Sequence, residues 1–393
     1  MPFSFKIEKK DKRTNARVGI IKTSHGTIKT PAFAPVATKA SVKSLSPEDL
    51  LKSGSQVVLG NTYHLYLRPG TEVLKKFKGF GPFMGWRGPT ITDSGGYQVS
   101  FLWEGNKKTQ KNADEPTGRV IKITDQGAWF SSYIDGSKHL LTPEKSMQIQ
   151  KELGADIIMA FDQPLGLGYS RAAKKEAFGR TLKWEERSFV AWKRLKSSQA
   201  LFGIVQGDTD EKLRRASFKF VLETGFPGIA MGGESIGKDP KITARTLDTV
   251  SDLLPDDKPL HALGLGGGPE GIFEAIQRGV DIFDNTGITR MARTGLLFIY
   301  PEDGGTRQNK FRMDINKKSF KSDKKPISKI CECEACQNFS RAYLHHLLTS
   351  GELLGLRLAS IHNVFYINDL MRKIRRSIIK NDFLTFKKTW LKT

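Results

Sequence analysis

Short apolar segments that end in a glycine or a polar residue recur along most of the chain, and most are followed by a helical segment. They are continuous rather than alternating, which is typical of parallel strands buried on both faces. There are eight of them, at 32–37, 56–59, 90–92, 156–161, 201–205, 228–231, 260–263 and 280–283. The segments predicted to be helical are 46–52, 142–153, 172–197, 209–223, 241–254 and 269–278. Strands that alternate with helices in this way predict an α/β fold, a (β/α)8 TIM barrel.

Three regions do not follow this alternation of strands and helices. Residues 1–30 are basic and predict a small N-terminal sheet, with a hairpin formed by 18–21 and 26–28. Residues 104–141 are first polar and then strand-like, which predicts an insertion after the third strand with its own antiparallel sheet. Residues 304–393 follow the eighth strand and contain the cysteines and further helices. We therefore predict a catalytic barrel over 1–303 and a zinc-binding, helical subdomain over 304–393.

The charge of the chain favours a polyanionic partner. Lys and Arg number 63 against 41 Asp and Glu, giving a net charge of +22. Nucleic acid is the first candidate for such a surplus, and an adaptation for solubility is the alternative. The chain begins without an apolar signal region and contains no apolar run long enough for a membrane span. We expect a cytoplasmic protein without membrane contact.

The three cysteines, Cys331, Cys333 and Cys336, lie within six residues. A clustered, odd set favours a metal site in a reducing compartment over a disulfide framework. Three thiolates need a fourth ligand to complete a tetrahedron. His362 is the first candidate, with His345 and His346 as alternatives. Four protein ligands would make this a structural Zn2+ site, and a catalytic zinc with an open position is the competing interpretation.

Polar residues at the ends of the predicted strands should meet at the carboxyl-terminal mouth of the barrel. They are Asn61, Asp93, Asp162, Gln206, Gly232, Gly233, Gly264 and Asp284. Each aspartate alone fits an ordinary loop, but three at one mouth suit chemistry at a sugar anomeric carbon or recognition of a purine edge. Mg2+ binding is a competing use of these carboxylates.

Three loops near these ends add binding chemistry. Gly95 and Gly96 would let the backbone approach a ligand, and Tyr97 offers a flat ring. A simple Asp-Ser-Gly-Gly turn is the alternative there. The glycine-rich loop at 264–269 could hold a phosphate or be a plain barrel loop. Arg290 and Arg293 could hold a nucleic acid, or be a solvated pair.

Taken together, these residues resemble the tRNA-guanine transglycosylase family of bacterial type, over essentially the whole chain. The motifs are specific as a set. They are Leu59-Gly60-Asn61-Thr62-Tyr63-His64-Leu65, Asp93-Ser94-Gly95-Gly96-Tyr97-Gln98, Phe161-Asp162, Phe202-Gly203-Ile204-Val205-Gln206-Gly207, Gly232-Gly233, Phe283-Asp284 with Thr289-Arg290, and the three cysteines with His362.

The resemblance implies an enzyme of queuosine biosynthesis, a pentosyltransferase, that exchanges guanine at the wobble position of tRNAs with GUN anticodons for a 7-deazaguanine base. Asp284 would be the nucleophile in a covalent enzyme–RNA intermediate, and Asp93 the proton acceptor. The substrate-binding residues would be Asp93, Ser94, Gly95, Gly96, Tyr97, Asp162, Gln206, Gly233 and Leu263.

The resemblance further implies contacts with the tRNA anticodon loop. The residues concerned are Gly264, Leu265, Gly266, Gly267, Gly268, Pro269, Glu270, Thr289, Arg290, Met291, Ala292 and Arg293. One structural zinc and a homodimer are also expected from the resemblance.

The sequence departs from the bacterial pattern where the base would bind. Leu263 occupies the position where the family usually has Met. Asn285, directly after Asp284, occupies the position where the family usually has Cys. Gln163-Pro164 follows Asp162 instead of Glu-Cys. Glu234 stands for Leu, while Lys238 stands for a Glu. The incoming base is therefore 7-aminomethyl-7-deazaguanine, as in most bacterial relatives, or queuine.

Four other functions are compatible with parts of this sequence. A queuine-inserting salvage enzyme of the same fold would differ only in the base that it inserts into the tRNA. A non-catalytic RNA-binding accessory subunit typically loses the two acids that are present here at 93 and 284. A relative that modifies DNA is disfavoured by Arg290 and Arg293. A barrel glycosidase acting on neutral sugars fits neither the basic charge nor the cysteine cluster.

Overall fold

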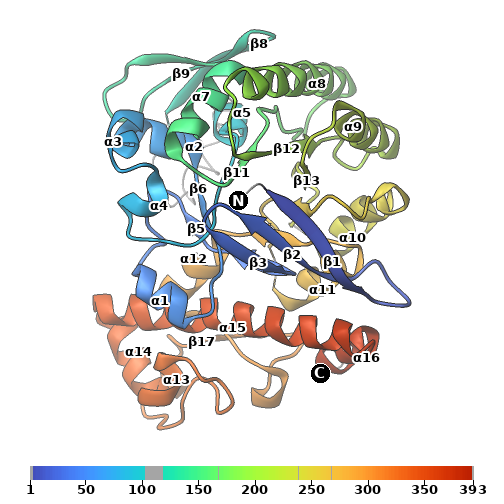
Figure 1. The fold of residues 1–393 in the computed structure, drawn as a ribbon. Coiled ribbons are helices and arrows are strands. Elements are labelled where there is room, and N and C mark those ends of the chain that lie inside the picture. The colour runs from blue at the N-terminus through green and yellow to red at the C-terminus, as the bar shows by residue number, and fades with distance from the viewer. Residues whose placement is uncertain (1–2, 102–117, 167, 238, 267, 392–393) are drawn as a thin grey trace.

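The computed structural model describes residues 3–101, 118–166, 168–237, 239–266 and 268–391, and its centre is one parallel sheet surrounded by helices (Figure 1). The order of its strands is β4-β15-β14-β13-β12-β11-β7-β6-β5. They are β4 (Ala32–Ala34), β5 (Val36–Ala37), β6 (Val58–Gly60), β7 (Thr90–Thr92), β11 (Ile157–Met159), β12 (Ala200–Val205), β13 (Gly228–Met231), β14 (Leu260–Ala262) and β15 (Ile282–Asp284).

The sheet closes into the expected barrel because its two outermost strands are consecutive in the chain. β4 and β5 flank Pro35, so the predicted first strand is divided into two short ones. A proline has no N–H to donate to a ladder, which accounts for the break. The Pro35 carbonyl still accepts a hydrogen bond from the Leu59 N–H at 3.0 Å. The (β/α)8 prediction is thus confirmed, with one strand split.

Helices follow most barrel strands, as predicted. They are α1 (Pro47–Lys52), α2 (Thr62–Leu65), α3 (Thr71–Lys76), α4 (Phe80–Phe83), α5 (Gly96–Phe101), α7 (Pro143–Leu153), α8 (Arg171–Arg194), α9 (Glu211–Thr224), α10 (Pro240–Asp248), α11 (Pro269–Gln277) and α12 (Gly287–Arg293), with a π-turn at Tyr66–Gly70. Thr142 caps α7 by accepting a hydrogen bond from the Lys145 N–H, the cap that the Thr-Pro pair predicts. Two predicted helices were too long at their ends: α8 ends at Arg194, and α10 ends at Asp248, with a separate 3-10 turn over Ser251–Leu253.

A small antiparallel sheet closes the amino-terminal end of the barrel. It contains β1 (Ser4–Lys10), β2 (Arg17–Thr23) and β3 (Gly26–Thr30). Its residues bond to residues that precede barrel strands: Ser24 donates to Asp156 at 2.8 Å, and Arg17 pairs with Asp281 at 2.6 Å. With this end covered, the carboxyl-terminal mouth is the end left for a ligand.

The inserted sheet after the third barrel strand is also present. It consists of β8 (Arg119–Thr124), β9 (Gly127–Ser131) and β10 (Lys138–Leu141). β9 ends at Ser131, and the Ser132 N–H turns back to bond to the Ser137 carbonyl at 2.8 Å. The polar start of the insertion at 104–117 lies outside the described residues.

The segment after the barrel packs along its outside. It contains β16 (Leu296–Phe298), 3-10 turns at Pro301–Asp303 and Lys318–Phe320, β17 (Arg312–Asp314), α13 (Glu334–Asn338), α14 (Arg341–Thr349), α15 (Leu353–Ile379) and α16 (Phe383–Leu391). The 27-residue α15 runs below the barrel in Figure 1 and contacts α1, β2 and β4. β16 and β17 pair across the predicted boundary at residue 303, and the division into two domains stays a prediction.

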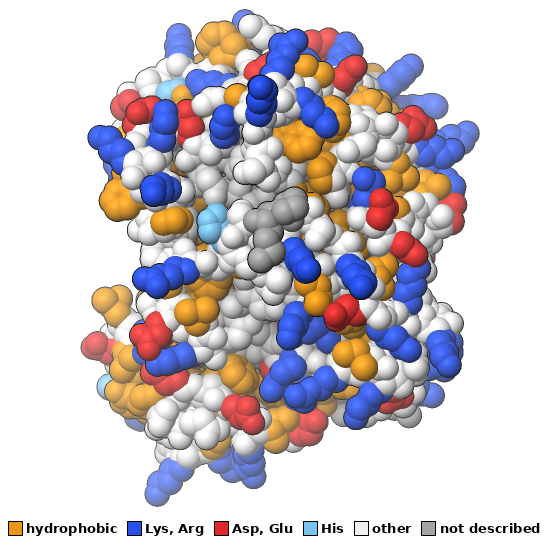
Figure 2. All heavy atoms as spheres, viewed as in Figure 1, with side chains coloured by type: hydrophobic (Ala, Val, Ile, Leu, Met, Phe, Trp, Pro, Cys, Tyr) orange, Lys and Arg blue, Asp and Glu red, His pale blue; other side chains and the backbone are white. Residues whose placement is uncertain are grey.

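The surface carries the positive charge expected from composition. On the face seen in Figure 2, Lys and Arg side chains are more abundant than Asp and Glu and are spread over both the barrel and the C-terminal segment. In the described part of the chain, no helix combines the length and the apolarity that a membrane crossing requires.

Candidate active site

Asp93 follows β7 directly and is held by the loop after β6. Its Oδ2 accepts a hydrogen bond from Asn61 Nδ2 at 2.5 Å, and its Oδ1 accepts one from the Thr62 N–H at 2.8 Å. Burial, together with the charges of Asp284 and Asp162, raises the pKa of Asp93 to about 7, against the lowering effect of the Thr62 N–H. A carboxyl group titrating near neutrality can both give and take a proton.

Asp162 follows β11 at the next position around the mouth and is almost fully buried. Ser94 Oγ donates to its Oδ1 at 2.8 Å, and Gln206 Nε2 donates to its Oδ2 at 2.7 Å. Burial raises the pKa of Asp162 to about 6, although both hydrogen bonds act in the opposite direction. The three residues form one continuous polar group on the floor of the mouth.

The Gly232-Gly233 turn after β13 packs directly on Gln206. A Cβ atom at Gly232 would lie 2.6 Å from Gln206 Nε2, and Gly233 has a φ of +95°, so both positions favour glycine. Gln206 Oε1 is buried and has no hydrogen-bond partner among the described residues. An unsatisfied acceptor of this kind in a mouth suits a ligand with N–H groups.

Arg214 on α9 contacts the Gly232-Gly233 turn. This residue was not identified from the sequence. It is fully buried, and its guanidinium donates to the carbonyls of Val205, Asp208 and Gly232 at 2.7–3.2 Å. It also donates to Ser235 Oγ at 3.0 Å. The loops after β12 and β13 are thereby joined through one side chain.

Asp284 ends β15 and completes the set of acids. Its Oδ1 lies 2.9 Å from His261 Nε2 and accepts a hydrogen bond from the Gly264 N–H at 3.2 Å. β7, β11 and β15 run parallel in one closed sheet, so the three acids at their carboxyl ends lie at the same end of the barrel. The predicted meeting of Asp93, Asp162 and Asp284 at one mouth is therefore present.

Apolar and aromatic surfaces flank these acids. Tyr97 on α5 is 55% exposed, and its ring lies 4.7 Å from that of Phe101, centroid to centroid. Leu263, after β14, packs against the apolar interior of the barrel.

The predicted RNA-binding segments lie beside Asp284. Gly264 has a φ of +68°, and its carbonyl accepts a hydrogen bond from Asn285 Nδ2 at 3.3 Å. α11 begins at Pro269, and α12 carries the two arginines. Arg290, Met291 and Arg293 are half-buried, whereas Thr289 and Ala292 face the protein. Gly267 and Lys238 lie outside the described residues, and RNA contact by these segments stays a prediction.

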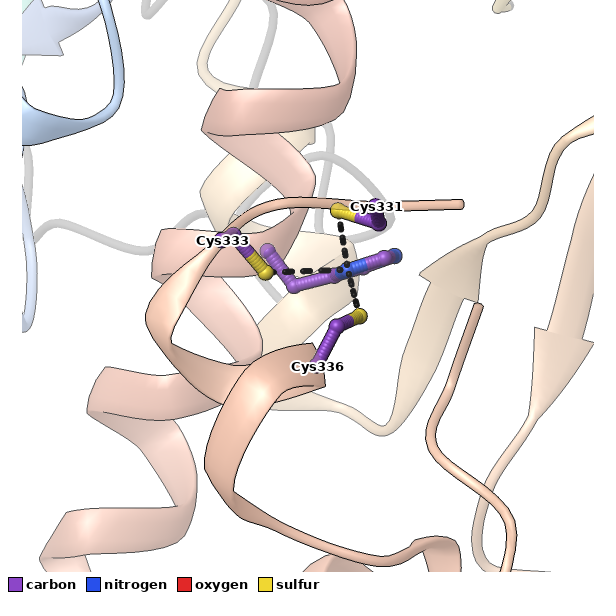
Figure 3. A group of neighbouring side chains, drawn as sticks. Cys331, Cys333 and Cys336 are labelled. Carbon is purple, nitrogen blue, oxygen red and sulfur yellow. Dashed lines mark hydrogen bonds between the residues drawn. The ribbon is translucent and has the colours of Figure 1, made fainter. Parts of the chain in front are cut away.

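The metal site is assembled as predicted from Cys331, Cys333, Cys336 and His362 (Figure 3). The three sulfurs lie 3.7, 3.5 and 3.3 Å from His362 Nδ1. A tetrahedral zinc with ordinary bond lengths would separate sulfur and nitrogen by about 3.6 Å. His362 Nε2 lies 2.7 Å from the Phe298 carbonyl, an acceptor that orients Nδ1 toward the sulfurs. The four residues therefore fit a metal ion with no position left open.

The two alternative histidines do not join this cluster. His345 Nδ1 lies 2.8 Å from the Ile315 carbonyl, and His346 is exposed. The site lies between α13 and α15, and its ligands come from neither the barrel strands nor their end loops. Its closed ligand set suits a structural role.

Comparison with known proteins gives a consistent result. A family model described as "Queuine tRNA-ribosyltransferase" matches residues 11–393. A queuine tRNA-ribosyltransferase of Desulforamulus reducens is 41% identical over 392 residues, covering 100% of this chain and 99% of its own. One from Roseiflexus sp. is 40% identical with full coverage of both chains. One from Psychrobacter sp. is 44% identical over 95% of this chain and 92% of its own.

The resemblance drawn from the motifs is thereby confirmed. These matches extend over the barrel, the inserted sheet and the metal site alike. The chain belongs to the queuine tRNA-ribosyltransferase family and is a transferase of that family.

Proposed function

We propose that this protein exchanges guanine at the wobble position of tRNAs with GUN anticodons for a 7-deazaguanine base, through a covalent enzyme–RNA intermediate. The observation that carries the proposal is the set of three aspartates at the barrel mouth, of which Asp93 has a pKa near 7 and Asp284 is fixed through one oxygen. The incoming base that we propose is 7-aminomethyl-7-deazaguanine, which makes the reaction a step of queuosine biosynthesis.

In the first displacement, a carboxylate oxygen of Asp284 attacks C1′ of the wobble nucleoside. The bond between C1′ and the base nitrogen breaks, its electron pair goes to guanine, and guanine takes the proton held by Asp93. In the second displacement, Asp93 accepts a proton from the incoming base, whose nitrogen attacks C1′. The ester bond breaks, and its electron pair returns to Asp284. Two displacements retain the configuration at C1′.

The base is proposed to bind between Tyr97 and Leu263, with its polar edge against Asp162, Gln206 and the Gly233 backbone. Asp162 accepts hydrogen bonds from N–H groups of a guanine-like edge. The exposed ring of Tyr97 supplies a stacking face. Such a position requires the wobble base to be turned out of the anticodon stack. Ser94, Gly95 and Gly96 shape the loop that approaches it.

The remaining assignments concern the tRNA, the metal and the assembly. The loop at 264–270 and the segment at 289–293 bind the anticodon loop, and the net charge of +22 favours the phosphate backbone. One Zn2+ bound by the three cysteines and His362 stabilises the C-terminal fold. The protein acts in the cytoplasm as a homodimer.

Incubation of the zinc-loaded protein with labelled guanine and unmodified tRNA bearing G at the wobble position tests the exchange. We expect label in this tRNA and none in the same tRNA with A at that position. Absence of label from both would refute the function. Competition between 7-aminomethyl-7-deazaguanine and queuine then identifies the incoming base, and stronger competition by queuine would correct that part of the proposal.

The covalent step has its own test. Asp284→Asn should abolish an RNA adduct that survives denaturing electrophoresis. Asp256→Asn is the matched control, because Asp256 is an exposed carboxylate that pairs with Lys10 of β1. An adduct that persists in Asp284→Asn would show that another residue is the nucleophile.

A further inference from the structure

His261 is a histidine in the middle of an apolar strand of the barrel. It lies on β14, its side chain is fully buried, and its strand partners are Ala230 on β13 and Ile282 on β15. Both partners belong to the apolar interior of the barrel. A buried imidazole in such surroundings calls for a polar partner.

That partner is Asp284. His261 Nε2 lies 2.9 Å from Asp284 Oδ1, and the Gly264 N–H donates to the same oxygen at 3.2 Å. Within the described residues, both hydrogen bonds to this carboxylate end on Oδ1. Two donors on one oxygen fix the rotation of the carboxylate and leave Oδ2 as the atom directed at a substrate.

The other ring nitrogen defines the protonation state that fits this arrangement. His261 Nδ1 is buried and has no hydrogen-bond partner among the described residues. An imidazolium would bury a charged N–H there, which costs more than a bare nitrogen. The neutral ring with its proton on Nε2 is the tautomer that donates to Asp284.

We propose that His261 is a positioning residue that holds Asp284 for attack through Oδ2. This inference rests on the proposed function. When Oδ2 forms the ester, Oδ1 becomes its carbonyl oxygen, and His261 and Gly264 remain its donors. When the ester bond breaks, negative charge returns to the carboxylate, and the same two donors stabilise it. No proton needs to leave the imidazole in either step.

Two amide substitutions of different length distinguish a positioning role of His261 from a role in packing alone. In His261→Gln the amide nitrogen can occupy the place of Nε2, whereas in His261→Asn it falls short of Asp284. We expect the rate of adduct formation, measured in a single turnover with saturating tRNA, to fall about 100-fold in the Asn variant. The Gln variant should recover most of that loss, with the KM for guanine unchanged in both.

The pH profile provides a second readout, because the Gln variant contains no titratable ring. Its profile should match that of the wild type, and a displaced profile would overturn the neutral-donor assignment. Equal adduct rates in the two variants, with melting temperatures that show both are folded, would overturn the positioning role. If the Asn variant does not fold, the Gln variant is compared with His261→Leu. The positioning role would then be overturned by a Gln variant that forms the adduct as slowly as His261→Leu, or by a Gln variant that also fails to fold. Wild-type protein that incorporates no guanine would instead refute the proposed function itself.

Discussion

Asn61 Nδ2 lies 2.5 Å from Oδ2 of Asp93, and Asn61 Oδ1 accepts the His64 N–H at 3.0 Å. The same side chain therefore caps α2 and holds the acid at the end of the neighbouring strand. The cap fixes the Asn61 rotamer, so the amide always presents a donor to the carboxylate. A donor to a carboxylate lowers its pKa, so loss of this hydrogen bond should raise the pKa of Asp93.

Removal of that donor should shift the pH dependence of the first displacement. In Asn61→Ala the pKa of Asp93 should rise by about one unit above its wild-type value. Since Asp93 is proposed to give a proton to the departing guanine, kcat/KM for tRNA should decrease above about pH 7 in the wild type and only above about pH 8 in the variant. The profile of Gln56→Ala, an amide at the closed end of the barrel, should match the wild type.

Asp93 should also reduce the stability of the fold at neutral and alkaline pH. Its pKa is higher in the folded state than in the unfolded chain, so the folded state binds more protons and stability declines as pH rises from about 4 to 7. Asp93→Asn removes this loss. We expect its melting temperature to exceed that of the wild type by about 2–5 °C at pH 8 and by less at pH 5, measured by calorimetry. An equal difference at both pH values would contradict the raised pKa.

Ser94 is expected to matter for base binding. In Ser94→Ala, Asp162 loses one of its two side-chain donors, and the KM for guanine should rise about 10-fold. Ser100 is a matched control in the same loop and helix, because its hydroxyl is buried without a partner among the described residues. Ser100→Ala should leave the KM unchanged. Equal effects of the two substitutions would show that Ser94 acts only through packing.

Arg214 and its neighbour Arg215 form a second matched pair. Arg214→Lys would leave several buried carbonyls without donors, which should lower the free energy of unfolding by about 2–4 kcal/mol and raise the KM for guanine. Arg215 pairs with Asp252 at the surface, and Arg215→Lys should change stability by less than about 0.5 kcal/mol. Denaturant titration measures both, and a KM unchanged in Arg214→Lys would disprove its effect on the Gly232-Gly233 turn.

The metal site predicts the reactivity of all three cysteines in the chain. With zinc bound, none should react with a thiol reagent, because each sulfur is a buried ligand. After chelation all three should react, and the melting temperature should fall. Elemental analysis should find one zinc per chain in the wild type and little in Cys336→Ser. Full thiol reactivity of the zinc-loaded protein would contradict the assignment of the ligands.

The accuracy of the sequence predictions varied with the kind of contact involved. Buried parallel strands such as β12 and β13 were located from their continuous apolar runs, and the acids that end such strands meet because of the barrel's symmetry. The N-terminal sheet was predicted over 1–30, but only its hairpin was given bounds, and those of β1 come from the structure. Arg214 and His261 were missed. Each looks ordinary in its own segment, and its role depends on partners brought close only by folding.

The path of α15 has a consequence for the biosynthesis of the protein. Arg357 on this helix pairs with Asp49 at 2.6 Å, Asn368 donates to the Ser53 carbonyl at 2.8 Å, and Arg375 donates to the Pro31 carbonyl at 2.6 Å. These partners leave the ribosome some 300 residues earlier than the helix. The surface of the first barrel strands that α15 packs against therefore stays uncovered through most of translation. His362 on the same helix reaches the cysteines only then, so binding of a metal ion by these four residues would be a late event in the maturation of the chain.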